Sequence, residues 1–146
     1  MALDIKNKLA EAWKSILEDN TYIAAAGIQG VISGDNATEK AAVEYIVAVN
    51  EVTRDFLNVP LWTANVAFSA MTHTGHDKSG DACDVLFQNM LDVMANTSTS
   101  ALSTAAGFYI HAITGISGGV MELDEDSFRR ISCQCEVKLE PSRSVS

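Results

Sequence analysis

The stretch Ile131-Ser132-Cys133-Gln134-Cys135-Glu136-Val137-Lys138-Leu139 decides the fold class of this chain. Its apolar and polar residues alternate, which is typical of a β-strand with one buried face. Cys133 and Cys135 point to the same face, so we interpret them as small core residues. A disulfide between them would strain the strand, and a redox role would need an exposed, electropositive setting. Pro141 is expected to end the strand.

Alternation, or a run of β-branched and aromatic residues, predicts four more strands. They are Ala24–Ser33, Val43–Val52, Trp62–Met71 and Phe108–Ser117. The third is the clearest, with Trp62, Ala64, Val66, Phe68 and Ala70 on one face. Gly34-Asp35-Asn36 favours a turn, and Ser117-Gly118-Gly119 favours a turn or a bulge.

Apolar residues at steps of three and four predict two amphipathic helices, Leu3–Leu17 and Asp81–Met94. Ser79 or Asp81 is expected to cap the second helix. Its buried stripe would consist of Ala82, Val85, Leu86, Met90, Val93 and Met94. A short helix within 96–106 is expected to start at a cap on Ser98 or Thr99 and to stop at Gly107.

This order of elements favours an α+β fold, a mainly antiparallel sheet with the two main helices packed on one face. A chain of 146 residues with 47% hydrophobic content suits one domain. We predict that domain over residues 1–140, followed by a flexible C-terminal tail at 141–146.

Charge and terminal sequence exclude several classes of protein. The net charge of −9 repels phosphate, so sequence-specific nucleic-acid binding is not expected. The first residues lack the basic start and apolar run of a secretory signal, so the chain is expected to stay in the cytosol where it is made. Ser, Thr and Asn interrupt the uncharged stretch 93–121, so no membrane span is predicted. The 3 cysteines are expected to be reduced thiols.

One loop gathers metal-binding residue types. His73, His76 and Asp77 follow a predicted strand, with Asp81 and Cys83 nearby, and imidazole and carboxylate can share a divalent ion. The ligand set is incomplete and the composition is typical of a solvated loop, so we predict no metal and no cofactor. No G-K-[ST] motif is present. Gly115-Ile116-Ser117-Gly118-Gly119 matches G-x-S-x-G in letters, but it falls where a strand ends in an expected turn or bulge, and the motif requires a strand-to-helix elbow. We therefore predict that the chain is not an enzyme.

The order of elements, more than any motif, resembles the small tail-terminator or tail-completion proteins of tailed bacteriophages, which join the tail tube to the neck. The parts that carry the resemblance are Leu3–Leu17, Val43–Val52, Trp62–Met71 with His73-Thr74-Gly75-His76-Asp77, Asp81–Met94, Phe108–Ile116 and Phe128–Leu139. The chain departs from that pattern before Val43, where Glu39-Lys40-Ala41-Ala42 stands in place of an aromatic-proline pattern. A head–tail connector or another neck protein therefore stays open.

The resemblance implies a virion protein made in the host cytoplasm that forms a homo-oligomeric ring, a hexamer, on the last ring of the tail tube. Its partners would be other copies of itself, the tail tube protein and a neck or connector protein. Ring contacts would involve Met71, His73, His76 and Asp77 in one loop, and Asp124, Glu125 and Asp126 in another. Acidic walls would let DNA slide through without sticking.

Three other interpretations stay open from the residues alone. The 73–77 loop could serve a small enzyme or a ligand-binding domain, or the chain could be an adaptor unconnected to virions. The run Asp124-Glu125-Asp126 is typical of a solvated loop, and its functional alternative is an interface for a basic patch.

Overall fold

In the part of the chain that the structure describes, five strands form one sheet in the order β1-β2-β3-β5-β4. The computed structural model describes residues 2–26, 28–32, 43–54, 60–75, 77, 79–123 and 128–144. The elements are α1 (Ala2–Glu18), α2 (Thr21–Ala26), β1 (Gln29–Ile32), β2 (Val43–Arg54), β3 (Trp62–His73), α3 (Asp81–Asn96), α4 (Thr99–Ala106), β4 (Phe108–Leu123) and β5 (Phe128–Ser144). Among these described strands, β1 and β2 pair in parallel and the other pairs are antiparallel.

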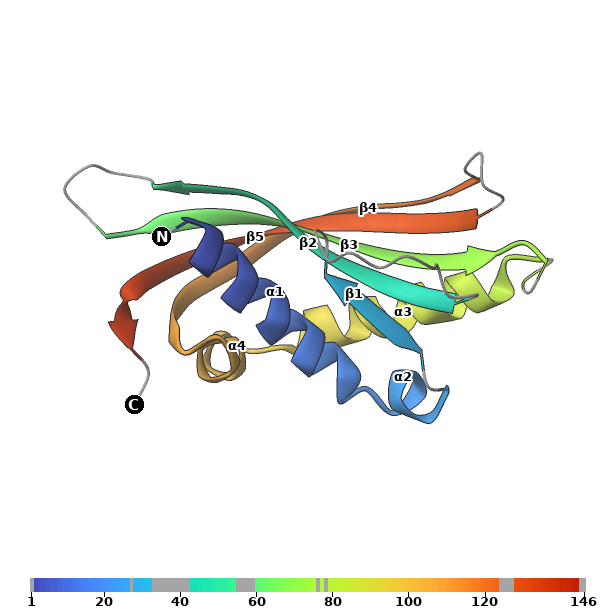
Figure 1. Cartoon of the computed structure of the whole chain (residues 1–146), viewed down its shortest axis with the longest axis horizontal. Helices are drawn as coiled ribbons and strands as arrows, with labels where there is room; N and C mark the ends of the chain where they lie inside the picture. Colours follow the sequence, from blue (N-terminus) through green and yellow to red (C-terminus); the bar gives the residue numbers. More distant parts are fainter. Residues whose placement is uncertain are drawn as a thin grey trace.

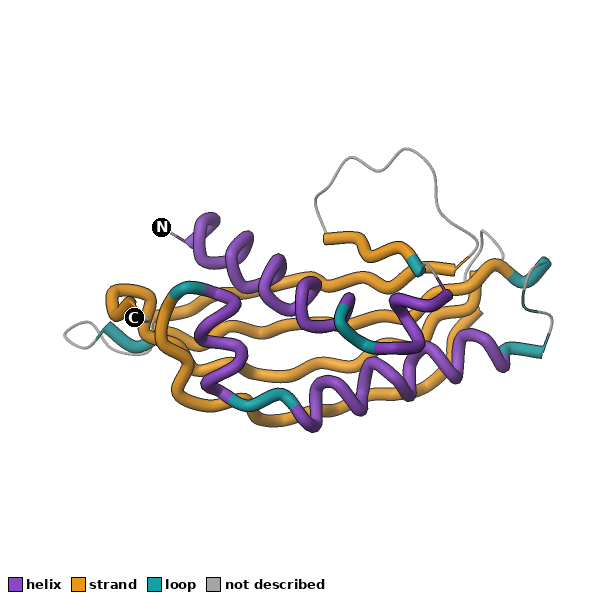
Figure 2. The backbone as a smooth tube through the Cα atoms, turned by 90° about the horizontal axis from the view of Figure 1, so that it is seen from below, coloured by secondary structure: helices purple, strands orange, loops and turns teal. Residues whose placement is uncertain are grey.

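The helices lie on one face of the long, twisted sheet (Figure 1), and Figure 2 shows them from that side. The predicted α+β class is therefore confirmed. The core lies between the two layers, where Trp13 of α1 meets Phe68 of β3 edge to face with ring centroids 5.2 Å apart. Burying such aromatic pairs stabilises a core beyond the area they remove from water.

The predicted inward face of β5 is confirmed. Its alternate side chains are at most 2% exposed: Ile131, Cys133, Cys135, Val137 and Leu139. Residues between them, such as Gln134 and Glu136, are exposed and point to the opposite face of the strand. The strand continues past Pro141 to Ser144, so the expected end at the proline is wrong. Pro141 falls where the pairing with β4 is irregular, between Tyr109↔Glu140 and Phe108↔Ser144, so its missing N–H interrupts no regular ladder.

Two other strand predictions need correction. The segment Ala24–Ala26 belongs to helix α2 and not to a strand, because Asn20 Oδ1 accepts a hydrogen bond from the Ile23 N–H at 3.0 Å and alanine favours helix. β4 runs on to Leu123, because Ser117-Gly118-Gly119 forms bulges within the strand and not a turn. The proposed turn at 34–36 lies outside the described residues.

Helix α3 begins at Asp81 as predicted but ends at Asn96, past the predicted end at Met94, and its buried face is slightly rotated. Val85 is 44% exposed, whereas Cys83 and Phe87 are buried together with Leu86, Met90 and Met94. The steps of three and four residues from Cys83 onward keep these side chains on one helical face. Helix α4 matches its prediction, since Ser98 caps it by accepting from the Ala101 N–H at 3.0 Å, and Gly107 ends it in the left-handed conformation.

Candidate functional site

The corner between β3 and α3 is organised by one buried carboxylate. Asp77 is 5% exposed, and its side chain accepts hydrogen bonds from the N–H groups of Gly80, Ala82 and Cys83 at 3.0–3.1 Å. It also accepts from Thr72 Oγ1 at 2.9 Å. Asp77 therefore satisfies N–H groups that the start of α3 leaves without helical partners.

The expected caps of α3 are wrong. The residue at the cap position is Gly80, in the left-handed conformation and without a side chain to offer. Ser79 is exposed and its Oγ accepts only a long bond, 3.4 Å, from the Asp81 N–H. Asp77 replaces both expected caps because the turn before the helix folds its carboxylate back over the first N–H groups.

Burial by itself would raise the pKa of Asp77, because a carboxylate loses hydration inside the protein. The hydrogen bonds from Cys83, Ala82, Thr72 and Gly80 outweigh this effect and hold the pKa of Asp77 below its ordinary value. The carboxylate is therefore stabilised in its charged form by the turn that it organises.

The other residues of the predicted loop also make contacts within the subunit. The His73 ring packs edge to face on Phe128 at 5.1 Å, and its Nδ1 accepts a hydrogen bond from the Gly75 N–H at 3.1 Å. Met71 is 1% exposed, with Arg130 Nη2 lying 3.4 Å from its sulfur. His76 lies outside the described residues.

The described residues of the 71–77 segment and those that flank residues 124–127 lie at the same end of the sheet. His73 pairs with Phe128 across β3 and β5, and Leu123 pairs with Arg129 in the adjoining hairpin. Arg129 Nε donates to the Asp77 carbonyl oxygen at 3.2 Å, which ties the hairpin to the corner. Asp124, Glu125 and Asp126 lie outside the described residues, and Leu123 directly before them is 65% exposed.

No group of three or more His, Cys, Asp or Glu side chains among the described residues could hold a metal ion. Cys83, one of the suggested ligands, is buried beneath the corner, where its thiol lies 3.5 Å from the Ala70 carbonyl oxygen as a hydrogen-bond donor. Burial raises the pKa of this thiol.

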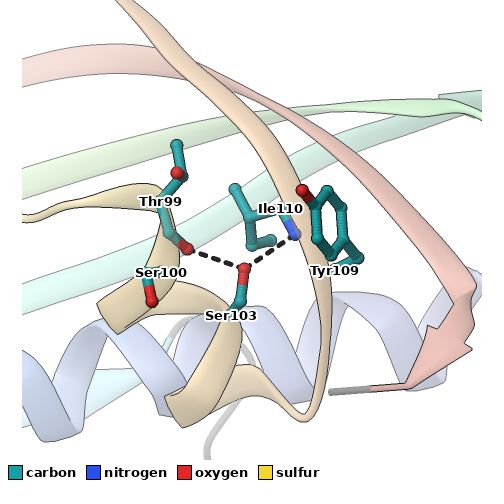
Figure 3. A pocket seen from close by; sticks show the side chains of 5 residues that line it. All are labelled: Thr99, Ser100, Ser103, Tyr109 and Ile110. Atoms are coloured by element: carbon teal, nitrogen blue, oxygen red, sulfur yellow. Dashed lines mark hydrogen bonds between the residues drawn. The ribbon is translucent and has the colours of Figure 1, made fainter. Parts of the chain in front are cut away.

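One shallow hollow lies between α4 and β4, lined by Thr99, Ser100, Ser103, Tyr109 and Ile110 (Figure 3). Ser103 donates to the Thr99 carbonyl oxygen at 2.6 Å and accepts from the Ile110 N–H at 2.9 Å. Its hydroxyl thus joins the helix to the strand that follows it, and both of its contacts are internal. The sequence did not point to this residue because Ser is common throughout this segment.

Comparisons with known proteins give only distant likenesses. No protein-family model matches the chain, and no curated protein matches it significantly in sequence. Among solved structures, a chain from "Virion of native gene transfer agent (GTA) particle" is similar with 13% identity and a TM-score of 0.48, over 95% of each chain. A second solved structure, whose name states no function, has 12% identity and a TM-score of 0.49, over 88% of this chain and 93% of its own. Likenesses at this level do not establish a shared function.

None of the helices in the described part of the chain is long and apolar enough to cross a membrane.

Proposed function

We propose that this chain is a structural virion protein of a tailed phage, a tail terminator whose copies form a ring on the end of the tail tube and join it to the neck. The proposal takes up the resemblance in element order, which runs from the leading helix through the strand–corner–helix unit to the closing hairpin. The homo-oligomer, the tube and neck partners and the non-catalytic role are parts of the same proposal.

The observation that carries the proposal is that the polar groups at the β3–α3 corner bond to other groups of the same subunit. The Asp77 carboxylate accepts hydrogen bonds from three backbone N–H groups and one hydroxyl. The His73 ring packs on Phe128 and accepts a hydrogen bond from the Gly75 N–H. Groups held in this way stiffen the junction of strand, helix and hairpin. A stiff junction suits a subunit that must present the same surface to every neighbour in a ring.

The sheet itself also suits lateral assembly. Among the described residues, β1 and β4 are the outermost strands, and each pairs with a strand on one side only. Side chains of β3 and β5 that alternate with the buried ones, such as Ala67, Ser132 and Gln134, are exposed or half-exposed and therefore belong to the face opposite the core. Unpaired strand edges and half-exposed sheet faces are surfaces that neighbouring protein chains can cover.

The test is to mix the purified protein with tail tubes of the same virus and to image the tube ends by electron microscopy. We expect a cap on the tube end with the unchanged protein and no cap when Asp124, Glu125 and Asp126 are all changed to Lys. Asp92→Lys, a charge reversal on an exposed position of α3 away from this hairpin, is the control and should cap normally. A folded protein that caps no tubes and binds no tube or connector protein would rule out the terminator role.

A further inference from the structure

The two edge strands of the sheet carry very little charge. β1 and β4 are the outermost of the described strands, and each pairs with a neighbouring strand on one side only. β1 lies within residues 20–34 and most of β4 lies within residues 93–121, and neither stretch contains Asp, Glu, Lys or Arg. The whole chain is 20% charged, and β2 and β5, the strands next to the edges, both carry charged residues. The central strand β3 also has no charge, but it is paired on both sides.

This distribution is the reverse of what protects most sheets. An open edge presents a row of backbone N–H and C=O groups that can pair with another chain, and natural proteins often place charged side chains there to prevent it. β4 is covered or interrupted over parts of its length by other means. Near its start, the Ile110 N–H donates to Ser103 Oγ of α4 at 2.9 Å (Figure 3). Farther along, bulges follow Thr114 and Gly118.

A short regular stretch of β4 lies between these features. Register shifts precede Ala112 and follow Thr114, and residues 112–114 pair one to one with residues 136–138 of β5. Thr114 is exposed, and Ala112 and Ile113 are half-exposed. The stretch is close in length to β1, which has four residues, Gln29–Ile32.

The directions of the two edge strands also suit each other. β1 is parallel to β2, and the pairings β2–β3, β3–β5 and β5–β4 are all antiparallel, so β1 and β4 run in opposite directions. Two copies placed side by side in the same orientation therefore bring β4 of one copy to β1 of the next as an antiparallel pair, which is slightly more stable per residue than a parallel one. A two-fold arrangement would instead join like edges and stop at two copies.

We propose that residues 112–114 of β4 in one copy pair with β1 of a second copy, so that the sheets of neighbouring subunits join edge to edge. This inference rests on the proposed ring function and names the two surfaces that would build the ring. A ring of identical copies needs two different surfaces on each subunit, and a contact between unlike edges closes when its rotation closes. With no charged side chain on either strand segment, no charge has to lose its hydration when the edges meet.

The test uses cross-linking between the two edges. Ile32→Cys in β1 and Thr114→Cys in β4 are combined in one chain and treated with a short bis-maleimide, with and without tail tubes. Cys83, Cys133 and Cys135 are buried and should not react in the folded protein. The two new thiols lie on opposite edges of a five-stranded sheet, about 19 Å apart or more, which a short reagent does not bridge within one subunit. Cross-linking between copies should therefore give a ladder of multimers on a denaturing gel.

The matched controls separate unlike edges from like edges. Thr114→Cys combined with Asp92→Cys, an exposed position on α3, should give no ladder. Each single-cysteine chain should stay uncross-linked. Dimers from Thr114→Cys alone would show that two β4 edges meet and would overturn the assignment.

Hydrogen exchange of the unchanged protein gives a second measurement that needs no substitution. Pairing between copies should slow exchange of the backbone N–H groups in residues 28–32 and 112–114 when the protein is bound to tail tubes. β3 is already paired on both sides and should show no added protection. Capped tubes in which neither edge gains protection would overturn the edge pairing.

The outcomes separate this inference from the terminator role. Capped tubes without a 32–114 ladder and without added protection would overturn the edge pairing and leave the terminator role intact. A ladder from a protein that caps no tubes would support the pairing and remove the role on the tube. A folded protein that gives neither a ladder nor caps would overturn the two proposals together.

Discussion

Asp77 is the residue on which the strand-to-helix corner depends most. Replacing it with Ala leaves the N–H groups of Gly80, Ala82 and Cys83 without this acceptor, and we expect the free energy of unfolding to fall by about 3 kcal/mol. Urea unfolding at neutral pH measures the loss. Ser79→Ala is the control and should change stability by less than about 0.5 kcal/mol, because Ser79 is exposed. Equal losses in the two variants would contradict the role of Asp77.

The same carboxylate should make stability depend on pH. Its pKa is lower in the folded than in the unfolded chain, so its contribution is fully present above the ordinary carboxyl pKa of about 3.9 and is lost as the pH falls through the folded value. We therefore expect the stability gap between the unchanged protein and Asp77→Asn to be widest near neutral pH and to shrink below about pH 4. Unfolding curves of both proteins across this range test the sign, and a gap that widens on acidification would contradict it.

Cys133 and Cys135 test which face of β5 is buried. Ser at either position should cost about 1–2 kcal/mol, whereas Glu should cost far more because the charge would be buried without a partner. Gln134→Glu is the control on the exposed face of the same strand. Thermal melts compare the variants, and equal tolerance of Cys135→Glu and Gln134→Glu would show that the buried face is assigned wrongly.

The two thiols should also be inert in the folded state. Burial raises the pKa of Cys133 to about 11 and that of Cys135 to about 12, with the neighbouring thiol and Glu136 adding to the second shift. Because the thiolate is the reactive form, a thiol reagent at about pH 8 should label neither residue until the protein is unfolded. Rapid labelling of the native protein, located by mass spectrometry, would contradict their burial.

At the scale of elements, the β4–β5 hairpin depends on its bulges. Gly118 has a φ of 111°, and a Cβ there would lie 2.5 Å from the Ser132 carbonyl oxygen, which is too close for any side chain. Gly115 also has a positive φ, 71°, but its Cβ would meet nothing within 4 Å. We expect Gly115→Ala to cost about 1 kcal/mol from backbone strain alone and Gly118→Ala to cost clearly more. Chemical denaturation compares the two, and equal losses would show that backbone strain alone decides both.

At the scale of the whole molecule, the proposed contact through Asp124, Glu125 and Asp126 predicts that assembly on the tail tube depends on salt. Exposed charges are screened over about 10 Å at 0.1 M salt and over about 3 Å at 1 M salt. We therefore expect fewer caps on tail tubes as the salt concentration rises over this range, while the melting temperature of the free subunit changes little. Counting capped ends and recording melts at each concentration checks both parts. Capping that does not respond to salt would argue against a charged contact at these three residues.

Much of this fold can be predicted from the amino-acid pattern, because residues that face the core recur at a fixed spacing along each strand and helix. The alternation in 131–139 is matched by alternating exposure in β5, and the steps of three and four in Leu3–Leu17 are matched by α1. The same reasoning fails where local signals compete. Alanines after Asn20 favour a helix over the expected strand, and glycines in β4 form bulges that sequence alone does not distinguish from a turn.

The sequence alone determined that this protein has a sheet layer and a helix layer, because the spacing of apolar residues shows which elements are strands or helices and which face of each points to the core. It also determined that Cys133 and Cys135 share a face, since alternate residues of a strand always do. Only the tertiary structure decided what Asp77 does, because its bonds depend on how the turn folds back over α3. Tertiary structure also brought residues 71–77 and the β4–β5 hairpin to one end, because strand register between segments far apart in the chain is set by packing of the whole sheet.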